Sequence, residues 1–368
     1  MRVPYNYLPF EFNSKSTKII FNKWKKLIKT TDFTLGSFVR EFEEIFTKYI
    51  GAKYCIATNN GTDALILSLK AAGISKGDEV ITVTNSFYAT TGAIVAIGAK
   101  PVFVDCDNRY QINIDEIEKF VTKKTTAILP VHWGGASPNM PAINKVAKKH
   151  NLIVIEDACM GIGAKINGKS PGTFGLIGAY SMHPLKSLNV MGDGGMVVTN
   201  NLSIYKWMLK YRNHGMTDRD NIDFWGVNYR IQPLQAIVAM ECLKKLDKVI
   251  NLRNKNANYY DKKLKNLNPH VVIPERPKGY LETYALYMVL CEKRDKLLKF
   301  LSKNNIECKI HYPIPLHLQK ASKKYGYREG MFPISEDQAK RLLTIPVHQF
   351  LNKGQLNHVV NSITEFYS

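Results

Sequence analysis

The sequence predicts an α/β protein, with a large three-layer α/β/α domain on a mostly parallel sheet and a smaller α/β domain behind it. Two observations carry this prediction. Short apolar runs alternate with helical patterns through the first half of the chain, which is typical of a doubly wound sheet with helices on both faces. Several of these runs are apolar on both faces, as buried parallel strands are. The chain of 368 residues, 45% of them hydrophobic, is long enough for two lobes.

The expected elements of the first half follow one another in strand–helix order. We expect strands at residues 54–58, 79–83, 101–104, 126–131 and 152–156, and helices at residues 63–72, 89–97, 114–121 and 140–149. Ligands of such sheets gather at the carboxyl ends of the strands. The residues that follow these strands are therefore the first candidates for a functional site.

The pattern changes after residue 186. Helices are expected at 202–211, 233–246 and 251–267, and strands around 284–289, 308–312 and 342–345. The second of these helices has proline in its first turn, where the ring suits the helix. We place a domain boundary near residue 246, which gives a large domain over 1–246, with an N-terminal arm, and a small C-terminal domain over 247–368.

Composition limits the classes of partner. The net charge of +20 would suit a polyanion, but the basic residues are spread along the chain and no nucleic-acid motif appears, so we expect a solvated lysine-rich surface and no nucleic-acid partner. No run of eighteen apolar residues appears and the N-terminus lacks a signal-peptide core, so we expect no membrane association. The six cysteines stand singly, without metal-ligand spacing, which predicts reduced thiols in a cytoplasmic protein and no metal site.

Lys186 and Asp157 indicate the chemistry. Lys186 precedes a glycine-rich turn at 192–195, and a lysine amine condenses with aldehydes to form a Schiff base. Asp157 ends a predicted strand, where its carboxylate could keep a pyridine nitrogen protonated through a charge-assisted hydrogen bond. The neighbouring Glu156 points to the opposite face and is expected to be structural. A Schiff-base lysine and an acid for a pyridinium nitrogen are the two marks of a pyridoxal phosphate site.

Each of the other candidates also has an ordinary interpretation. Gly61 and Thr62 open a helix whose free N–H groups suit a phosphate, although capped turns of this kind are commonplace. Phe87 could stack on a planar ring or fill the core. Ser181 could donate to a phosphate or bond to the local backbone. Taken alone, Lys186 could be a solvated surface lysine. Their order along one lobe is nevertheless the order that a fold type I pyridoxal phosphate enzyme needs.

Longer motifs run through the chain in a fixed order. They lie at residues 60–65, 87–90, 156–158, 172–175, 181–195, 212–215, 228–230, 234–236, 311–317 and 343–348. With these motifs the chain resembles the DegT/DnrJ/EryC1/StrS family of sugar aminotransferases over nearly its whole length. The resemblance implies the fold type I pyridoxal phosphate transferase architecture of the aspartate aminotransferase superfamily.

The resemblance also implies roles for individual residues. Lys186 would bind pyridoxal 5′-phosphate as the internal aldimine, alternating with the pyridoxamine phosphate form, and would shuttle the proton between the substrate carbon and C4′ of the cofactor. Asp157 would pair with the pyridinium nitrogen, and Phe87 would stack on the ring. The residues that would hold the phosphate are Gly61, Thr62 and Ser181.

Further roles concern the substrate and a second subunit. Asn228 would reach the phosphate of the neighbouring subunit's cofactor, which implies a homodimer with shared active sites. Met160 stands where the family pattern has Gln or His near the ring oxygen of the cofactor, and a thioether is only a weak acceptor there. The residues expected at the substrate are Tyr229, Arg230, His311 and Tyr312.

The activity implied is transfer of an amino group from an amino acid, L-glutamate, to a keto sugar. The expected acceptor is a nucleotide-linked 3- or 4-keto-6-deoxy sugar used for lipopolysaccharide, polysaccharide or other glycan precursors, with some of the basic residues at the mouth of the pocket. Three alternatives stay open: amination of a keto sugar acid of the 8-amino-3,8-dideoxy-octulosonate type, a pyridoxal-dependent sugar 3-dehydratase, and a non-catalytic regulatory homologue. The dehydratases carry histidine where Lys186 stands, and a regulatory homologue should lose Lys186 or Asp157 first, since both are costly to bury unused.

Overall fold

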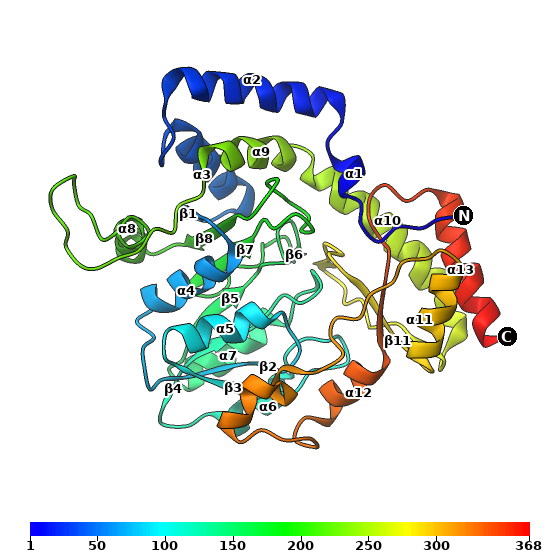
Figure 1. The fold of residues 1–368 in the computed structure, drawn as a ribbon. Coiled ribbons are helices and arrows are strands. Elements are labelled where there is room, and N and C mark those ends of the chain that lie inside the picture. Colours follow the sequence, from blue (N-terminus) through cyan, green and yellow to red (C-terminus); the bar gives the residue numbers. More distant parts are fainter.

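The computed structural model describes residues 1–368, which fold around a seven-stranded sheet in the order β1-β8-β7-β5-β4-β2-β3 (Figure 1). Neighbouring strands pair in parallel except β8, which is antiparallel to both β1 and β7. The mostly parallel sheet of the prediction is confirmed. Its strands are β1 (Tyr54–Thr58), β2 (Glu79–Val83), β3 (Lys100–Val104), β4 (Thr125–Leu129), β5 (Ile153–Asp157), β7 (Ile177–Ser181) and β8 (Gly195–Thr199).

Helices cover both faces of this sheet, as a three-layer domain requires. Alternate residues of a strand enter different cores: Cys55 and Ala57 pack with α2, α3 and α9, whereas Ile56 packs with α4, α5 and α8. Both faces are therefore buried, which explains why these strands read as continuous apolar runs. The helices of this domain are α2 (Ser14–Thr30), α3 (Ser37–Ile50), α4 (Gly61–Ala71), α5 (Tyr88–Ala96), α6 (Ile114–Ile117), α7 (Met140–Lys149), α8 (Leu202–Tyr211) and α9 (Pro233–Leu243).

A second core lies toward the C-terminal end, around a three-stranded antiparallel sheet in the order β12-β11-β9. The helix α10 joins the two cores, because Leu246 and Ile250 lie in the first and Ala257 and Tyr260 in the second. The boundary near residue 246 stays a prediction. The elements here are α10 (Leu246–Leu264), β9 (Val271–Val272), β11 (Tyr287–Cys291), α11 (Arg294–Lys303), α12 (Pro333–Arg341), β12 (Leu342–Ile345) and α13 (Lys353–Tyr367). A separate two-stranded antiparallel sheet pairs β6 (Lys165–Ile166) of the first half with β10 (Tyr280–Leu281).

The N-terminal segment runs across the molecule before α2 begins. Its short helix α1 (Leu8–Glu11) follows a backbone bridge between Val3 and Ile306, in which the Val3 N–H donates to the Asn305 carbonyl at 2.9 Å and the Val3 carbonyl accepts from the Glu307 N–H at 3.0 Å. Figure 1 shows the first residues beside α10 and α13, whereas α2 lies over α9. The segment therefore connects the C-terminal core with the large domain.

One expected strand is wrong. Residues 308–312 form a loop that makes a single bridge, between Lys309 and Thr344. The alternating pattern that predicted a strand has another cause, because Cys308 enters the C-terminal core while Tyr312 lies in a cavity. The helices α2 and α3 and the strand β7 are additions to the prediction.

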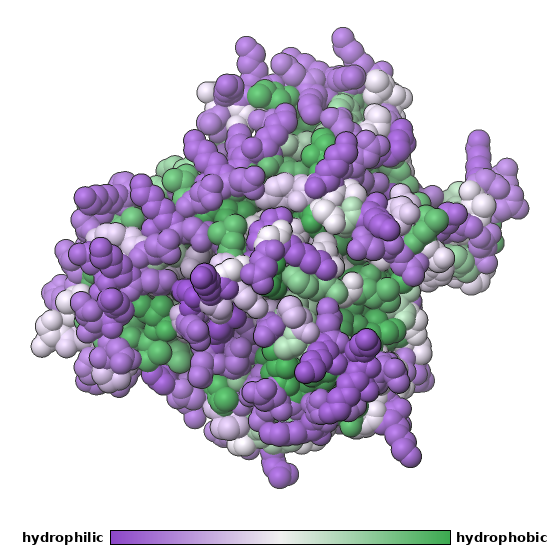
Figure 2. Space-filling model, turned by 180° about the vertical axis from the view of Figure 1, so that it is seen from behind, coloured by the Kyte–Doolittle hydropathy of each residue, from purple (hydrophilic) through white to green (hydrophobic).

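Polar side chains are spread over the molecular surface. Figure 2 shows hydrophilic residues across the whole of one face, with only small apolar patches between them. None of the helices combines the length and the apolar character that crossing a lipid bilayer would require.

Candidate active site

A cavity of about 620 Å³ opens where β1, β2, β5 and β7 end. This is the edge that the strand-end rule predicts for a ligand. The predicted site residues that line it are Gly61, Thr62, Phe87, Asp157, Met160, Ser181, Lys186, His311 and Tyr312. Residues from five separate regions of the chain thus meet in one place.

Lys186 lies in the connection between β7 and β8, where the backbone is held at two points. Its N–H donates to the His183 carbonyl at 2.8 Å, and its own carbonyl accepts from the Tyr7 hydroxyl at 3.0 Å. The side chain lines the cavity, and burial lowers the pKa of its ammonium below the usual value. More of the amine is therefore neutral near pH 7, which is the form that attacks a carbonyl.

Asp157 is the last residue of β5, and its buried carboxylate is fixed by two donors. The Thr90 hydroxyl donates to Oδ2 at 2.7 Å, and the Cys159 N–H donates to Oδ1 at 3.1 Å. Each carboxylate oxygen keeps a free lone pair. The carboxylate is therefore oriented at the cavity wall and can accept a further hydrogen bond.

Glu156 faces away from the cavity, as predicted, and anchors a loop. Its two oxygens accept from the N–H groups of Gly172, Phe174 and Gly175 at 2.6–2.7 Å, and Oε2 lies 2.9 Å from Nε2 of the buried His132. Two neighbouring carboxylates of β5 thus have separate tasks, one at the cavity and one within the fold.

The N-terminus of α4 supplies unpaired backbone donors. The Asn60 side chain caps the helix by accepting from the Asp63 N–H at 2.8 Å, while the N–H groups of Gly61 and Thr62 have no acceptor in the chain. The Ser181 hydroxyl accepts from the His183 N–H at 3.3 Å, which leaves its own hydrogen free to donate. These three groups border the same cavity and suit a phosphate.

Replacing Gly61 by alanine is expected to cost about 1–3 kcal/mol in the free energy of unfolding and to weaken phosphate binding. An added Cβ would lie 2.7 Å from the Ser181 Cβ and 3.3 Å from the Cys159 Sγ, so the helix start would have to shift. The matched control is Gly92→Ala in α5, where a Cβ meets nothing within 4 Å and a gain of up to about 1 kcal/mol is expected. Denaturant unfolding compares the two variants, and equal effects would contradict the crowding at Gly61.

Phe87 and Met160 occupy different parts of the cavity wall. The Phe87 side chain is 48% exposed, so the interpretation that it fills the core is wrong. Its ring lines the cavity, with its centroid 5.4 Å from that of Tyr88 and 6.4 Å from that of Tyr312. Met160 is half-buried, and its carbonyl accepts from the Thr283 hydroxyl at 2.8 Å.

His311 and Tyr312 reach the cavity from the 308–312 loop. Nδ1 of His311 lies 2.9 Å from the Thr344 hydroxyl, and its ring stacks on that of Tyr5 with centroids 6.2 Å apart. Burial, reinforced by the Lys186 charge, lowers the pKa of His311 to about 4. Burial raises the pKa of Tyr312 to about 12. Both side chains are therefore neutral at pH 7.

The protein should lose stability between pH 6.5 and pH 4 because of two cavity histidines. Burial lowers the pKa of His348 to about 4, as it does for His311, so the unfolded chain binds these protons at a higher pH than the folded one. The stability is complete above pH 6.5 and falls toward pH 4, by on the order of 2 kcal/mol per histidine. Thermal unfolding of His311→Gln and His348→Gln should be less sensitive to pH over this range, with His358→Gln on α13 as control. An unchanged pH dependence would contradict the assignment.

Three predicted site residues lie outside this cavity. Asn228, Tyr229 and Arg230 belong to the connection between α8 and α9, which projects from the body of the molecule (Figure 1). Arg230 donates from Nε to the Asn228 Oδ1 at 2.8 Å and from Nη1 to the Asn213 Oδ1 at 3.0 Å, so it fixes the exposed Asn228. The cavity of one chain is thus formed without them.

Other lining residues escaped the sequence prediction. Tyr5, Tyr7 and Arg253 line the cavity but lie outside every motif found in the sequence. Thr90 and His348 lie within the motifs at 87–90 and 343–348, although no role was expected for them. The charged side chains of the lining are two cations, Lys186 and Arg253, and the carboxylates Asp63, Asp157 and Asp193.

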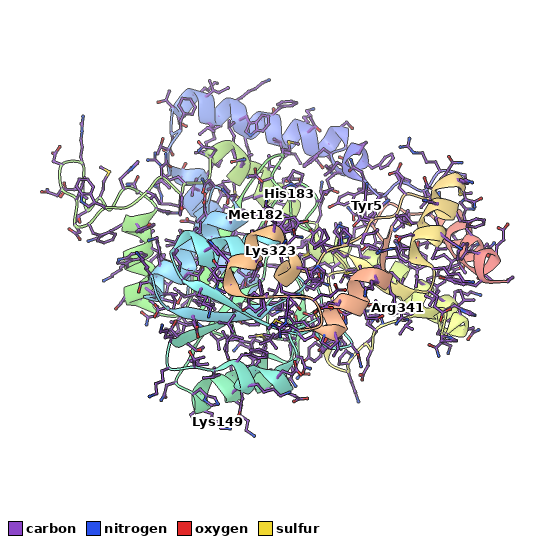
Figure 3. All side chains as sticks on the ribbon, turned by 60° about the horizontal axis from the view of Figure 1, so that its bottom comes forward. Tyr5, Lys149, Met182, His183, Lys323 and Arg341 are labelled. Carbon is purple, nitrogen blue, oxygen red and sulfur yellow. The ribbon has the colours of Figure 1, made fainter.

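The basic excess of the chain therefore does not reside in the cavity lining. Figure 3 shows Lys149 at the outer edge of the molecule, remote from Tyr5 and His183, which border the cavity.

The residues present fit pyridoxal phosphate. Lys186 offers an amine whose pKa burial lowers, Asp157 an oriented carboxylate with free lone pairs, and Phe87 a partly exposed aromatic ring. The unpaired N–H groups of Gly61 and Thr62 offer donors for the phosphate. The aldehyde, the ring nitrogen, the ring face and the phosphate of the cofactor thus each have a complementary group in the same cavity.

Comparison with known proteins agrees with this geometry. The model of the DegT/DnrJ/EryC1/StrS aminotransferase family matches residues 15–364. The chain is 39% identical to a pleiotropic regulatory protein of Geobacillus stearothermophilus, over 93% of this chain and 92% of that one. It is 36% identical to a dTDP-3-amino-3,6-dideoxy-alpha-D-galactopyranose transaminase of Aneurinibacillus thermoaerophilus, over 97% of each chain.

A solved structure extends the comparison to the cofactor. NtdA of Bacillus subtilis, with bound pyridoxamine phosphate, superimposes with a TM-score of 0.92 at 28% identity, covering all of this chain and 85% of that one. The architecture is therefore that of a pyridoxal phosphate aminotransferase. The chain belongs to the DegT/DnrJ/EryC1/StrS aminotransferase family, and its cofactor is pyridoxal 5′-phosphate.

Proposed function

We propose that this aminotransferase moves an amino group from L-glutamate to a nucleotide-linked keto sugar, a 3- or 4-keto-6-deoxy sugar. The observation that carries the proposal is the meeting of Lys186 and Asp157 in one cavity with an open Phe87 ring and free amides at α4. The sugar is supported by the dTDP-sugar transaminase that is 36% identical over 97% of the chain. The product would be a cytoplasmic precursor of lipopolysaccharide, another polysaccharide or a glycan.

Each cofactor-binding residue has a separate task in this proposal. Pyridoxal phosphate supplies an aldehyde that condenses with amines and a ring that accepts the electron pair released at the substrate carbon. Asp157, oriented by Thr90 and Cys159, would keep the ring nitrogen protonated. Phe87 would cover one face of the ring. The groups that would hold the phosphate are the Gly61 and Thr62 amides and the Ser181 hydroxyl.

Lys186 would act as the acid–base group of both half-reactions. Its Nζ would take the proton from the carbon that carries the amino group of the donor and would return a proton to the keto carbon of the acceptor. The lowered pKa of Lys186 suits this task, because a neutral amine accepts the proton and the resulting ammonium returns it. Its backbone, held by His183 and Tyr7, would keep Nζ at a fixed place in the cavity.

The sugar would lie toward His311 and Tyr312. Both side chains are neutral and offer hydrogen-bonding groups, since Nδ1 of His311 is engaged by Thr344 while Nε2 has no partner in the chain. A sugar hydroxyl can both donate to and accept from such groups. The Met160 thioether, in place of a polar side chain, would leave the cofactor's ring oxygen to another donor.

We further propose a homodimer with shared active sites. The segment between α8 and α9 supports it, because Trp225 is 89% exposed and Ile222 is exposed beside it, an arrangement that costs free energy unless a partner covers it. In such a dimer Asn228 of this segment would reach the phosphate of the neighbouring cofactor, and Tyr229 and Arg230 would lie toward the substrate. Sedimentation equilibrium of the wild-type enzyme tests the oligomeric state.

A screen of purified enzyme with keto sugars tests the activity. Formation of 2-oxoglutarate from L-glutamate, dependent on a dTDP-, UDP- or GDP-linked keto-6-deoxy sugar, would support the proposal. Amination of a keto sugar acid instead would favour the octulosonate alternative. Loss of a hydroxyl without use of glutamate would favour a dehydratase, and no reaction with any acceptor or donor would contradict the proposed function.

A further inference from the structure

Arg253, on α10, is a buried cation without an acidic partner. Its side chain lines the cavity and the residue is 2% exposed. Nε donates to the Gln349 Oε1 at 3.0 Å and Nη1 to the Tyr284 carbonyl at 3.3 Å, while Nη2 is buried and has no partner. No carboxylate oxygen lies within 4.0 Å of the guanidinium nitrogens.

The other buried arginines show how unusual this is. Arg212 pairs with Glu43, and Arg294 pairs with Asp295 at 2.6 Å. Burying a charge without a paired countercharge is costly, so the fold normally supplies one. The acid on this side of the cavity is Glu11, but Gln349 separates it from Arg253 by donating to the Glu11 Oε2 at 2.8 Å. The charge of Arg253 and its unpaired Nη2 donor therefore remain available for a ligand in the cavity.

We propose that Arg253 binds a carboxylate of the amino-acid donor. This inference rests on the proposed function, because every amino-acid donor carries a carboxylate that the cavity must accommodate. Lys186 and Arg253 are the only cationic side chains of the lining, and Lys186 is engaged by the cofactor. The phosphate has the amides of α4. Arg253 remains as the partner for a second anion, and a guanidinium forms strong charge-assisted hydrogen bonds with a carboxylate.

The surroundings of Arg253 suit an anionic ligand. The Tyr7 ring lies 5.0 Å from the guanidinium carbon, and the Tyr7 hydroxyl donates to the Lys186 carbonyl, so one side chain contacts both cationic residues. His348 lines the same part of the cavity and is neutral above pH 6, so it adds no competing charge. Tyr7 is therefore a positioning residue for Arg253.

The test separates the two half-reactions. In single-turnover experiments with the holoenzyme, Arg253→Gln should raise the apparent Kd for L-glutamate by about 10- to 100-fold, the usual effect of losing hydrogen bonds to a charged group. The half-reaction of the amino form of the enzyme with a nucleotide-linked keto sugar that carries no carboxylate should change little. An unchanged Kd for L-glutamate would overturn the proposal, and so would an effect confined to the acceptor half-reaction, which would assign Arg253 to a sugar carboxylate.

A binding measurement makes the result independent of turnover. 2-Oxoglutarate should raise the Tm of the wild-type enzyme and should raise that of Arg253→Gln much less. Equal shifts would overturn the proposal. If wild-type enzyme binds 2-oxoglutarate but does not convert L-glutamate, the proposed function fails, whereas the comparison of Tm shifts still tests whether Arg253 binds a carboxylate.

Two lysine variants control for folding. Arg253→Lys keeps a cation and replaces Arg253→Gln in the test if the glutamine variant does not fold. Its Kd for L-glutamate should rise about tenfold, because an ammonium cannot bind a carboxylate bidentately. The matched control is Arg276→Lys, since Arg276 pairs with Asp261 and Glu282 and lines no part of the cavity. Equal Kd values for the two lysine variants would overturn the assignment.

Discussion

Replacing Lys186 by alanine is expected to reduce transamination by at least about 10³-fold, because it removes the acid–base group of both half-reactions. The fold should survive, since the contacts that hold this segment are made by the Lys186 backbone with His183 and Tyr7. Coupled detection of 2-oxoglutarate gives the rate, and thermal unfolding gives the stability. The control is Lys149→Ala, at the outer edge of the molecule in Figure 3, which removes only a surface ion pair with Glu118.

A Lys186→Ala enzyme with wild-type turnover would contradict the role of this amine. The same variant also tests for a role other than transamination, because one relative is named as a pleiotropic regulatory protein. If cells carrying Lys186→Ala in place of the wild-type protein showed no defect, the biological role would not depend on transamination.

Replacing Asp157 by asparagine is expected to lower turnover by about 10²- to 10³-fold, because an amide cannot stabilise a protonated ring nitrogen. The asparagine keeps nearly the same shape: its oxygen can still accept from the Cys159 N–H, and the Thr90 hydroxyl can turn to accept from the new amide NH2, so the fold should change little. The matched control is the neighbouring Glu156→Gln, outside the cavity. In this control the new amide NH2 would face a backbone N–H, so that two donors meet. The variant should lose about 1–3 kcal/mol of stability.

The two variants should therefore separate function from stability. Asp157→Asn should have reduced turnover and nearly normal stability. Glu156→Gln should have nearly normal turnover and reduced stability. The opposite pattern, or equal behaviour of the two, would contradict the assignment of the cavity to one carboxylate and of the fold to the other.

Local sequence was sufficient for the part of the site that follows strands. Gly61, Phe87 and Asp157 follow or end β1, β2 and β5, and parallel strands bring their carboxyl ends together. Ser181 ends β7, a strand that the sequence did not predict. Six of the eight expected strands lie within two residues of an observed strand at each end, and five of the six belong to the large sheet, where both faces are buried and the apolar runs are continuous. Lys186 needed the resemblance to a family, since a lone lysine has no pattern of its own.

The remainder depends on contacts between distant parts of the chain. Tyr7 and Arg253 meet at the cavity although 246 positions separate them in the sequence, and an arginine in a lysine-rich helix gives no sign of being buried. The strand expected at 308–312 failed for the same reason. Its alternating pattern reflects two different environments, the C-terminal core and the cavity, and not the two faces of a sheet.

The N-terminal segment has a practical consequence for handling this enzyme. Val3 is hydrogen-bonded to the C-terminal core and Tyr7 lines the cavity, so residues 3–7 belong to the structure that forms the site. A purification tag with a protease site, or a truncation meant to aid crystallisation, would disturb catalysis if placed there. The exposed end of α13 at Ser368 is the safer point for a fusion or for attachment to a solid support.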